Sequence, residues 1–331
     1  MSMTLVEGLR AALVYELEHD DGVFVMGEDI GIGGSFHLTL GLQERFGEAR
    51  IRDTPVAEAG FVGLAVGAAV AGMRPVVDFQ YADFLLCAAD QIVQQASKLH
   101  AMSGGQVRVP MVMHAPTGAS GRGAQHANSV ENFFLGTPGL KIAVPSTPYD
   151  AKGVMTSAIR CDDPVLVLGH KHLYGTKGRR DDQHSDTVRD VPKDPYEATI
   201  GAGVVRRQGR DLTICATLLM VHRALEAAAL LAGEGVDCEV IDMCWLAPLD
   251  TALVVDSVAR TGRLLLVEEG SPSGGWGGIV AAAVADQALD ALDAPIKRVT
   301  GPDQPLPFAP HLEEQLIPSA GVIADAARAM L

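Results

Sequence analysis

Cysteine is scarce in this chain, and so are the patterns in which it builds metal or disulfide frameworks. Five cysteines occur among 331 residues, with no CxxC pair and no histidine at metal-ligand spacing. Neither zinc nor a disulfide framework is therefore expected, and we interpret the cysteines as buried free thiols of a reducing compartment. They are Cys87, Cys161, Cys215, Cys238 and Cys244.

Basic side chains and long apolar runs are also in short supply. Lysine and arginine total 26 against 41 acidic residues, and the formal charge of −15 would repel a phosphate backbone or an anionic membrane. No uninterrupted apolar stretch reaches the roughly 18 residues that span a bilayer, and no basic segment followed by an apolar run opens the chain. We expect a soluble, cytoplasmic protein that binds neither nucleic acid nor membrane.

The phosphate-binding loops of common nucleotide enzymes are missing. The sequence holds no GxxxxGK[ST] loop and no strand-linked GxGxxG. This absence counts strongly against a nucleotide-binding oxidoreductase, which the fold class alone would suggest.

Apolar strands that alternate with helices dominate what is present. Thr4-x-x-Glu7 predicts a capping box at the start of a helix that Asp20-Asp21-Gly22 ends, and a buried strand follows at 23–26. The pattern recurs in strands at 74–79, 111–113 and 141–144 and in helices near 83–101 and from 148. Such alternation favours a parallel sheet covered by helices, an α/β fold.

Residues 173–198 change in character and separate two domains. The stretch is polar and contains Pro192 and Pro195, which is typical of a linker. We expect domains at 1–174 and 198–331, joined by a linker at 175–197. In the smaller second α/β domain, strands are expected at 212–216, 236–241, 264–267 and 296–299, and helices near 221–233, 249–260 and 276–291.

The segment Glu58–Ala71 is apolar on all sides and rich in glycine and alanine. A helix of this composition is expected to be buried in a core or in an interface. Glu58 in its first turn is not explained by packing, because glutamate is rarely buried without a partner, so we expect a ligand contact there.

Polar residues follow several of the expected strands. Ligands of open parallel sheets gather beyond the carboxyl ends of the strands. Glu28, Glu58, Gln80 with Tyr81, and His126 occupy such positions and together indicate a site, although each alone could be a cap or a surface residue.

Several long blocks resemble, in order and spacing, the beta subunits of pyruvate, branched-chain 2-oxoacid and acetoin dehydrogenases. The resemblance covers essentially the whole chain. The blocks are GEDIG (27–31), DTPVAEAGFVGLAVGAAVAGMRPVVDF (53–79), DQIVQQASKLHAMSGG (90–105), GASGRGAQH (118–126), PGLKIAVPSTPYDAKG (138–153), DDPVLVLGHKHLYG (162–175), GRLLLVEEGSPSGGWGG (262–278) and RVTGPDQPLPFAP (298–310).

The resemblance implies a pyrimidine-binding, transketolase-like domain followed by a transketolase C-terminal-type domain, with thiamin diphosphate as cofactor. It implies that Glu58 hydrogen-bonds the aminopyrimidine ring and promotes its imino tautomer, which a carboxylate can do in a dry site. Phe84 matches the ring that stacks on the pyrimidine, and Glu28 and Gln80 match positions that line the same site. His126 matches the histidine thought to serve acyl transfer to a lipoyl group.

Some positions depart from the family pattern. His114 stands where arginine is frequent, and Ala127-Asn128 follows His126 where relatives commonly have Ser-Gln, which leaves the substrate open. The resemblance also points to a segment that can bind a structural potassium ion through main-chain oxygens. The matching positions are Met111, Ala158, Cys161 and Asp163, with Cys161 where an acid is frequent.

One absence fits this family. Enzymes that hold thiamin diphosphate on a single chain use a GDG motif and a later asparagine to bind its magnesium ion, whereas this chain has no GDG and only two asparagines, Asn128 and Asn132. The resemblance therefore implies that an alpha subunit holds Mg²⁺ and the diphosphate in an α2β2 heterotetramer. It also implies that the second domain serves assembly and docks a dihydrolipoyl acyltransferase core, whose lipoyl domain accepts the acyl group.

Two alternatives stay open. A split transketolase-like carbon–carbon ligase would use the same glutamate, and a non-catalytic scaffold would have lost the chemistry. The joint presence of Glu58, Phe84 and His126 argues against the scaffold. Pyruvate, a branched 2-oxoacid and acetoin are not distinguished as substrates.

Overall fold

The chain forms two compact units. The computed structural model describes residues 1–175 and 188–331. The first unit comprises Met1–Thr117 with Phe134–Ile200, and the second comprises Gly118–Phe133 with Gly201–Leu331. Residues 176–187 of the expected linker lie outside the described residues, and its described remainder belongs to the first unit. The boundaries 1–174, 175–197 and 198–331 stay a proposal.

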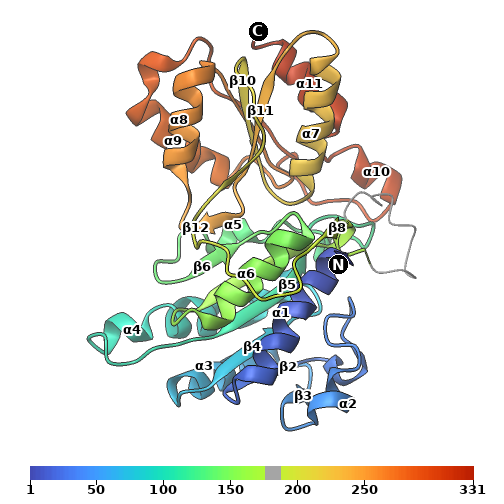
Figure 1. The fold of residues 1–331 in the computed structure, drawn as a ribbon, viewed down its shortest axis with the longest axis vertical. Coiled ribbons are helices and arrows are strands. Elements are labelled where there is room, and N and C mark those ends of the chain that lie inside the picture. Colours follow the sequence, from blue (N-terminus) through green and yellow to red (C-terminus); the bar gives the residue numbers. More distant parts are fainter. Residues whose placement is uncertain (176–187) are drawn as a thin grey trace. The chain divides into compact units, whose positions relative to one another are not determined.

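The first unit is built on a parallel sheet. Its strand order is β6 (Lys141–Ala143), β7 (Val165–His170), β5 (Val112–Thr117), β4 (Arg74–Asp78), β2 (Val23–Gly27) and β3 (Ile51–Asp53), and every neighbouring pair is parallel. Every residue of β2, β5 and β7 is buried, as expected for continuous apolar strands inside a covered sheet. The helices α1 (Leu5–His19) and α6 (Pro148–Arg160) lie side by side over the sheet (Figure 1).

Side-chain caps fix where these two helices begin. Thr4 Oγ1 accepts a hydrogen bond from the Glu7 amide at 3.4 Å, and Glu7 Oε2 accepts one from the Thr4 amide at 2.7 Å, which confirms the expected capping box. Thr147, the residue before Pro148, likewise accepts a hydrogen bond on Oγ1 from the Asp150 amide. Both caps satisfy amides that the first helical turn leaves without carbonyl partners.

The expected regular helix near 83–101 is wrong. The segment is a 3-10 helix at Ala82–Ala88 (η2), a π-helix at Gln91–Ala96 (η3) and a short α-helix at Leu99–Met102 (α4). Its buried apolar positions 82, 85 and 88 are three residues apart and are followed by 92 and 96, four apart. The winding changes because the apolar spacing changes, and a period of three matches a 3-10 helix.

Helix α3 (Glu58–Val70) is buried on one side only within this chain. Residues 61, 62, 65, 66 and 69 form its buried face and pack towards β4, η2 and η3, whereas Leu64 and Val70 are exposed. The expectation that α3 is buried on all sides within this chain is therefore wrong. The alternative interpretation, an interface helix, stays a prediction.

The second unit has a mixed sheet between two helix pairs. Its strand order is β14 (Lys297–Val299), β13 (Leu264–Val267), β10 (Leu212–Ala216), β11 (Cys238–Asp242) and β9 (Val204–Arg207). All pairs are parallel except β9 with β11. Figure 1 shows α7 (Leu219–Ala232) and α11 (Ala320–Arg328) on one side of β10 and β11, and α8 (Thr251–Thr261) and α9 (Trp276–Gln287) on the other.

The elements expected in the second domain are confirmed, with ends displaced by a few residues. The edge strand β9 was not expected, because its sequence VVRR is half-buried and lacks a continuous apolar run. Shorter elements are β1 (Ser2–Met3), paired antiparallel with β8 (Arg189–Asp190), α2 (Leu42–Phe46), α5 (Glu131–Phe134), β12 (Trp245–Ala247), α10 (Pro310–Glu314), and the 3-10 turns η1 (Ile30–Ile32), η4 (Ala124–His126), η5 (Lys171–Leu173) and η7 (Leu289–Ala291).

Two general expectations can be compared with the structure. Cys215, Cys238 and Cys244 are buried, but Cys161 is only half-buried and Cys87 is exposed, so the expectation of buried thiols is wrong for Cys87. Cys87 lies on η2 between the buried positions 85 and 88 and faces away from the core. Among residues 1–175 and 188–331, no helix combines the length and apolar character that a membrane crossing requires.

Candidate functional site

The carboxyl ends of three strands in the first unit meet at one edge. In the sheet register, Gly27 of β2 pairs with Asp53 of β3 and with Asp78 of β4. The residues that follow these strands, Glu28 among them, therefore leave the sheet together. A Cβ atom on Gly27 would lie 2.2 Å from the main-chain oxygen of Asp78, so this close approach requires glycine.

Gln80 is held in place at this edge by two side chains. Its Nε2 donates to Asp29 Oδ2 at 2.9 Å, and its Oε1 accepts from Ser35 Oγ at 2.6 Å. Gln80 thus bridges the loop after β2 and the segment after β4. Both polar ends of its amide are engaged, so the orientation of the side chain is fixed before any ligand binds.

Glu28 is a buried carboxyl that lacks a hydrogen-bond partner on one oxygen. Its side chain is 8% exposed, and Oε1 has no partner among the described residues. Burial, followed by the charges of Glu58 and Asp29, raises the pKa of the Glu28 carboxyl above its ordinary value. Thr54 Oγ1, beyond the end of β3, is also buried and without a partner in the described chain. Buried polar atoms in this state are available to bind a ligand or an ordered water.

Glu58 is the first residue of α3 and is half-buried. Its N-cap neighbour Ala57 supplies no side-chain hydrogen bond to the helix. Glu58 lies near enough to Glu28 to raise the pKa of the Glu28 carboxyl. The structure therefore brings Glu28, Glu58 and Gln80 to one edge, as the sequence predicts, and offers two carboxyl groups in different environments for proton transfer.

Aromatic rings border these polar groups. Phe84 lies on η2, half-buried, with its ring edge-on to Tyr81 at 5.9 Å. Phe36 meets the same Tyr81 ring at 5.8 Å, and Lys171 Nζ lies 5.5 Å from its centroid. A flat heterocycle that donates hydrogen bonds would find carboxyl acceptors and apolar ring faces here.

A buried network below this edge was not predicted from the sequence. His114 Nδ1 lies 2.7 Å from Asp78 Oδ1, and its Nε2 lies 3.0 Å from the Tyr174 hydroxyl. Burial and the Asp78 charge raise the pKa of Tyr174 well above its ordinary value. Because Asp78 ends β4, the network fixes the strand end from which Gln80 emerges. A histidine inside an otherwise apolar strand was the only sequence signal.

His126 belongs to the second unit. It ends the 3-10 turn η4 in the segment Gly118–Phe133, and it is half-buried. The other four predicted site residues, Glu28, Glu58, Gln80 and Phe84, belong to the first unit. A joint site that contains His126 stays a prediction.

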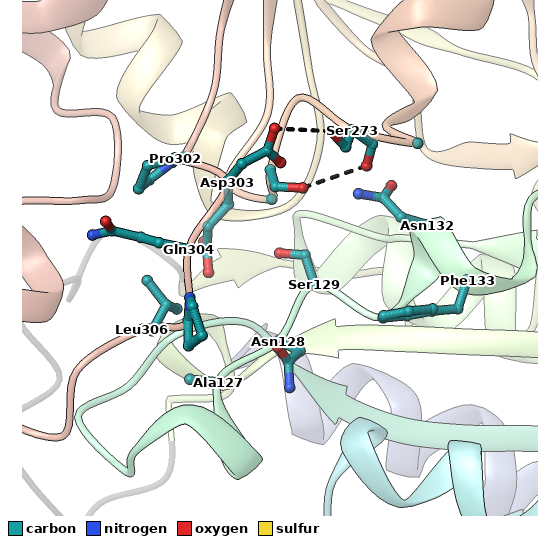
Figure 2. A pocket seen from close by; sticks show the side chains of 16 residues that line it. Ala127, Asn128, Ser129, Asn132, Phe133, Ser273, Pro302, Asp303, Gln304 and Leu306 are labelled. Carbon is teal, nitrogen blue, oxygen red and sulfur yellow. Dashed lines mark hydrogen bonds between the residues drawn. The ribbon is translucent and has the colours of Figure 1, made fainter.

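A cavity of about 590 Å³ lies within the second unit, beyond the carboxyl ends of β13 and β14 (Figure 2). Sequence reasoning missed it, although the turn-rich stretches after both strands carried a signal. Ser273 Oγ donates to Asp303 Oδ2 at 2.8 Å, and hydrogen bonds from Ser273 and Ser271 lower the pKa of Asp303. The lining residues include Asn128, Ser129, Asn132, Phe133, Glu269, Ser271, Ser273, Pro302, Asp303, Gln304 and Leu306.

Glu131 is buried beside this cavity. It opens the short helix α5, is 5% exposed, and its Oε2 has no partner among the described residues. Burial, and after it the charges of Glu269 and Glu268, raise its pKa to about 7, against a lowering by a hydrogen bond from its own main-chain amide. Glu131 thus holds a proton in the folded protein at pH values where the unfolded chain has lost it.

Replacement of Glu131 by glutamine is expected to stabilise the protein at alkaline pH. Because the folded pKa lies above the unfolded one, the stability that the proton contributes is complete below about pH 4.5 and is lost as pH rises through about 7. Ionised Glu131 therefore costs about 3 kcal/mol, which neutral glutamine avoids. In thermal unfolding, E131Q should exceed the parent by several degrees at pH 8 and match it at pH 5. Glu314→Gln, an exposed control, should show no such divergence, and a constant E131Q difference across pH would contradict the burial of the charge.

The expected potassium site remains a prediction. The Cys161 carbonyl accepts from Arg74 Nη1 at 3.0 Å, and the Met111 carbonyl accepts from the Val165 amide at 2.9 Å. Ala158 lies inside α6, and the Asp163 carboxylate pairs with Lys141. The Cys161 and Met111 carbonyls each already accept a hydrogen bond, so each would have only its second lone pair for an ion.

Comparisons with known proteins agree with this arrangement. The family "Transketolase, pyrimidine binding domain" matches residues 1–177, and "Transketolase, C-terminal domain" matches residues 201–323. The expected fold class is thereby confirmed. A solved structure described as "Split gene transketolase, inactive beta4 tetramer" superposes with a TM-score of 0.76 at 23% identity, covers 100% of this chain and 99% of that chain, and shows likeness of fold alone.

Three relatives match over nearly their whole length. "Pyruvate dehydrogenase E1 component subunit beta" of Rickettsia felis is 43% identical, with 99% of this chain and 98% of that protein covered. "2-oxoisovalerate dehydrogenase subunit beta" of Bacillus subtilis is 41% identical, with 98% of each covered. "Acetoin:2,6-dichlorophenolindophenol oxidoreductase subunit beta" of Cupriavidus necator is 42% identical, with 97% and 95% covered.

Proposed function

Because this chain belongs to the family of beta subunits of thiamin-diphosphate-dependent 2-oxoacid and acetoin dehydrogenases, we propose that it forms half of such an active site. With an alpha subunit it would decarboxylate a 2-oxoacid oxidatively, or cleave acetoin, and pass the acyl group to a lipoyl group. The observation that carries the proposal is the buried Glu28 carboxyl, with one oxygen unpartnered, beside Glu58 at the carboxyl edge of the sheet.

The residues at this edge fit the aminopyrimidine half of the cofactor. Bound thiamin diphosphate supplies an electron sink for the bond broken next to the carbonyl. Glu58 would accept a hydrogen bond from a ring nitrogen and stabilise the proton there, while Glu28, whose pKa is raised, would take up a proton at the same edge. Phe84 and Tyr81 would exclude water and so strengthen these contacts.

Sequence similarity to the relatives does not distinguish between the possible substrates. The relatives named for pyruvate, 2-oxoisovalerate and acetoin are 43%, 41% and 42% identical to this chain. The deciding experiment supplies the reconstituted α/β pair with each of the three substrates and follows acylation of a lipoyl domain. Ketol transfer between sugars without lipoyl acylation would favour the alternative, a split transketolase-like ligase.

Glu58→Gln is expected to remove most activity and leave assembly with the alpha subunit intact. The amide keeps the shape of the side chain but cannot stabilise a proton on the ring, and general acid–base groups of this kind contribute roughly 10²-fold or more. Turnover of the α/β pair is measured beside gel filtration of the complex. Glu44→Gln, at an exposed position in the first turn of α2, is the matched control. Turnover of E58Q close to that of the control would refute the role of Glu58.

His126→Ala is expected to impair acyl transfer to a lipoyl domain more than decarboxylation followed with an artificial electron acceptor. The imidazole is proposed to move the proton that transfer to the lipoyl sulfur requires. Both rates are measured on the same preparation of the α/β pair. Equal losses in the two assays would give His126 a general binding or structural role instead.

The chain without its partner is expected to bind thiamin diphosphate poorly and to be inactive. It offers groups to the pyrimidine half, but a net charge of −15 opposes the diphosphate, for which the alpha subunit is proposed to hold Mg²⁺. The exposed apolar face of α3 should also make the isolated chain self-associate. Calorimetric titration with the cofactor and magnesium, with and without the alpha subunit, measures the difference. Tight magnesium-dependent binding and turnover by this chain alone would overturn the proposal.

A further inference from the structure

The loop that carries His126 makes few main-chain hydrogen bonds of its own. Gly118, Gly121 and Gly123 have φ values of 82°, 68° and 87°, which take the backbone through the left-handed region three times. A chain with such turns cannot form a helical or strand ladder, so its amides need partners from elsewhere. Apart from η4, the segment from Gly118 to His126 has no regular secondary structure.

Two carboxylates from distant parts of the second unit meet these amides. Glu269 Oε1, just beyond β13, accepts from the Ala119 amide at 2.6 Å. Glu313 Oε1, on α10, accepts from the Gly121 amide at 2.5 Å, and Glu313 is only 4% exposed. The acceptors lie 150 and 192 residues from their donors along the chain. Hydrogen bonds to a charged acceptor are shorter and stronger than neutral ones.

A third contact covers the same loop. A Cβ atom on Gly123 would lie 2.9 Å from the Phe308 ring, so the ring rests against a glycine that leaves room for it. The His126 amide in turn donates to the Gly123 carbonyl at 3.0 Å. The position of Gly121 and Gly123 therefore determines where the turn that carries His126 begins.

We propose that Glu313 and Glu269 are positioning residues that hold the histidine loop, Gly118–His126, so that His126 is presented in one orientation. The inference rests on the proposed function where it assigns acyl transfer to His126. Glu313 is the cleaner residue to test, because Glu269 also lines the cavity and faces Glu131. The arrangement predicts that loss of one carboxylate loosens the loop without emptying the core beneath it.

Glu313→Ala, compared with Glu314→Ala on the same short helix, tests this inference in the assembled α/β pair. Glu314 is exposed, so its replacement changes charge and helix propensity equally without touching the loop. In hydrogen exchange, E313A should speed exchange in 118–126 by roughly tenfold or more, the size expected when a charge-assisted hydrogen bond is lost. Acyl transfer to a lipoyl domain should fall by a similar factor, with decarboxylation by artificial acceptor within about twofold of the control.

Glu313→Gln provides a rescue, because its amide oxygen can still accept from Gly121. It should restore most of the protection and most of the transfer rate. Unchanged exchange in 118–126 of E313A would overturn the positioning role whatever the activities, and so would equal losses of both activities with a lowered melting temperature. If H126A spares acyl transfer while E313A still deprotects the loop, the assignment of His126 fails and the positioning role stands.

Discussion

The site depends on the parallel register that brings the ends of β2, β3 and β4 to one edge. Gly27 lies between Asp53 and Asp78 in that register, so the residues that follow are crowded into one place. Glycine permits this crowding, since any side chain at position 27 would collide with the main chain of β4. Burial at this edge, and after it the neighbouring charges of Glu58 and Asp29, raise the pKa of Glu28.

A buried carboxyl with an unpartnered oxygen costs free energy unless something binds it. In the first unit this carboxyl is Glu28, at the edge where a heterocycle that donates hydrogen bonds would offset the cost. Gln80 is already fixed at the same edge by Asp29 and Ser35. The sequence contains no motif that would hold the charged diphosphate half of the cofactor, and the net charge of −15 opposes any phosphate. Binding of a cofactor or of a partner chain at this edge would stabilise the folded protein.

The sequence predicted what depends on local pattern. Apolar runs located β2, β4, β5 and β6 of the first sheet and β10, β11, β13 and β14 of the second, and the capping box located the start of α1, because these signals act within a few residues. The rule that ligands gather at carboxyl strand ends located Glu28 and Gln80. The His114 network, the burial of Glu131 and the cavity of the second unit depend on residues far apart in the chain, and no local pattern reports such pairings. The prediction of one regular helix near 83–101 was wrong because the spacing of apolar residues changes from three to four within this segment.

Three neighbouring acids in the second unit show why residue type alone could not reveal these roles. Glu268 is buried and paired with Arg298 at 2.7 Å, so its charge is compensated by an ion pair. Glu269 uses its charge on the amide of Ala119, where a loop without its own ladder needs an acceptor. Among the described residues, Glu131 Oε2 has neither kind of partner, and the carboxyl keeps its proton to about pH 7 instead. The same carboxyl group is thus neutralised by a cation, by a main-chain dipole or by a proton, and only the fold decides which. Since Glu268 and Glu269 both raise the pKa of Glu131, ionisation of Glu131 at higher pH acts directly against the carboxylate that holds the histidine loop.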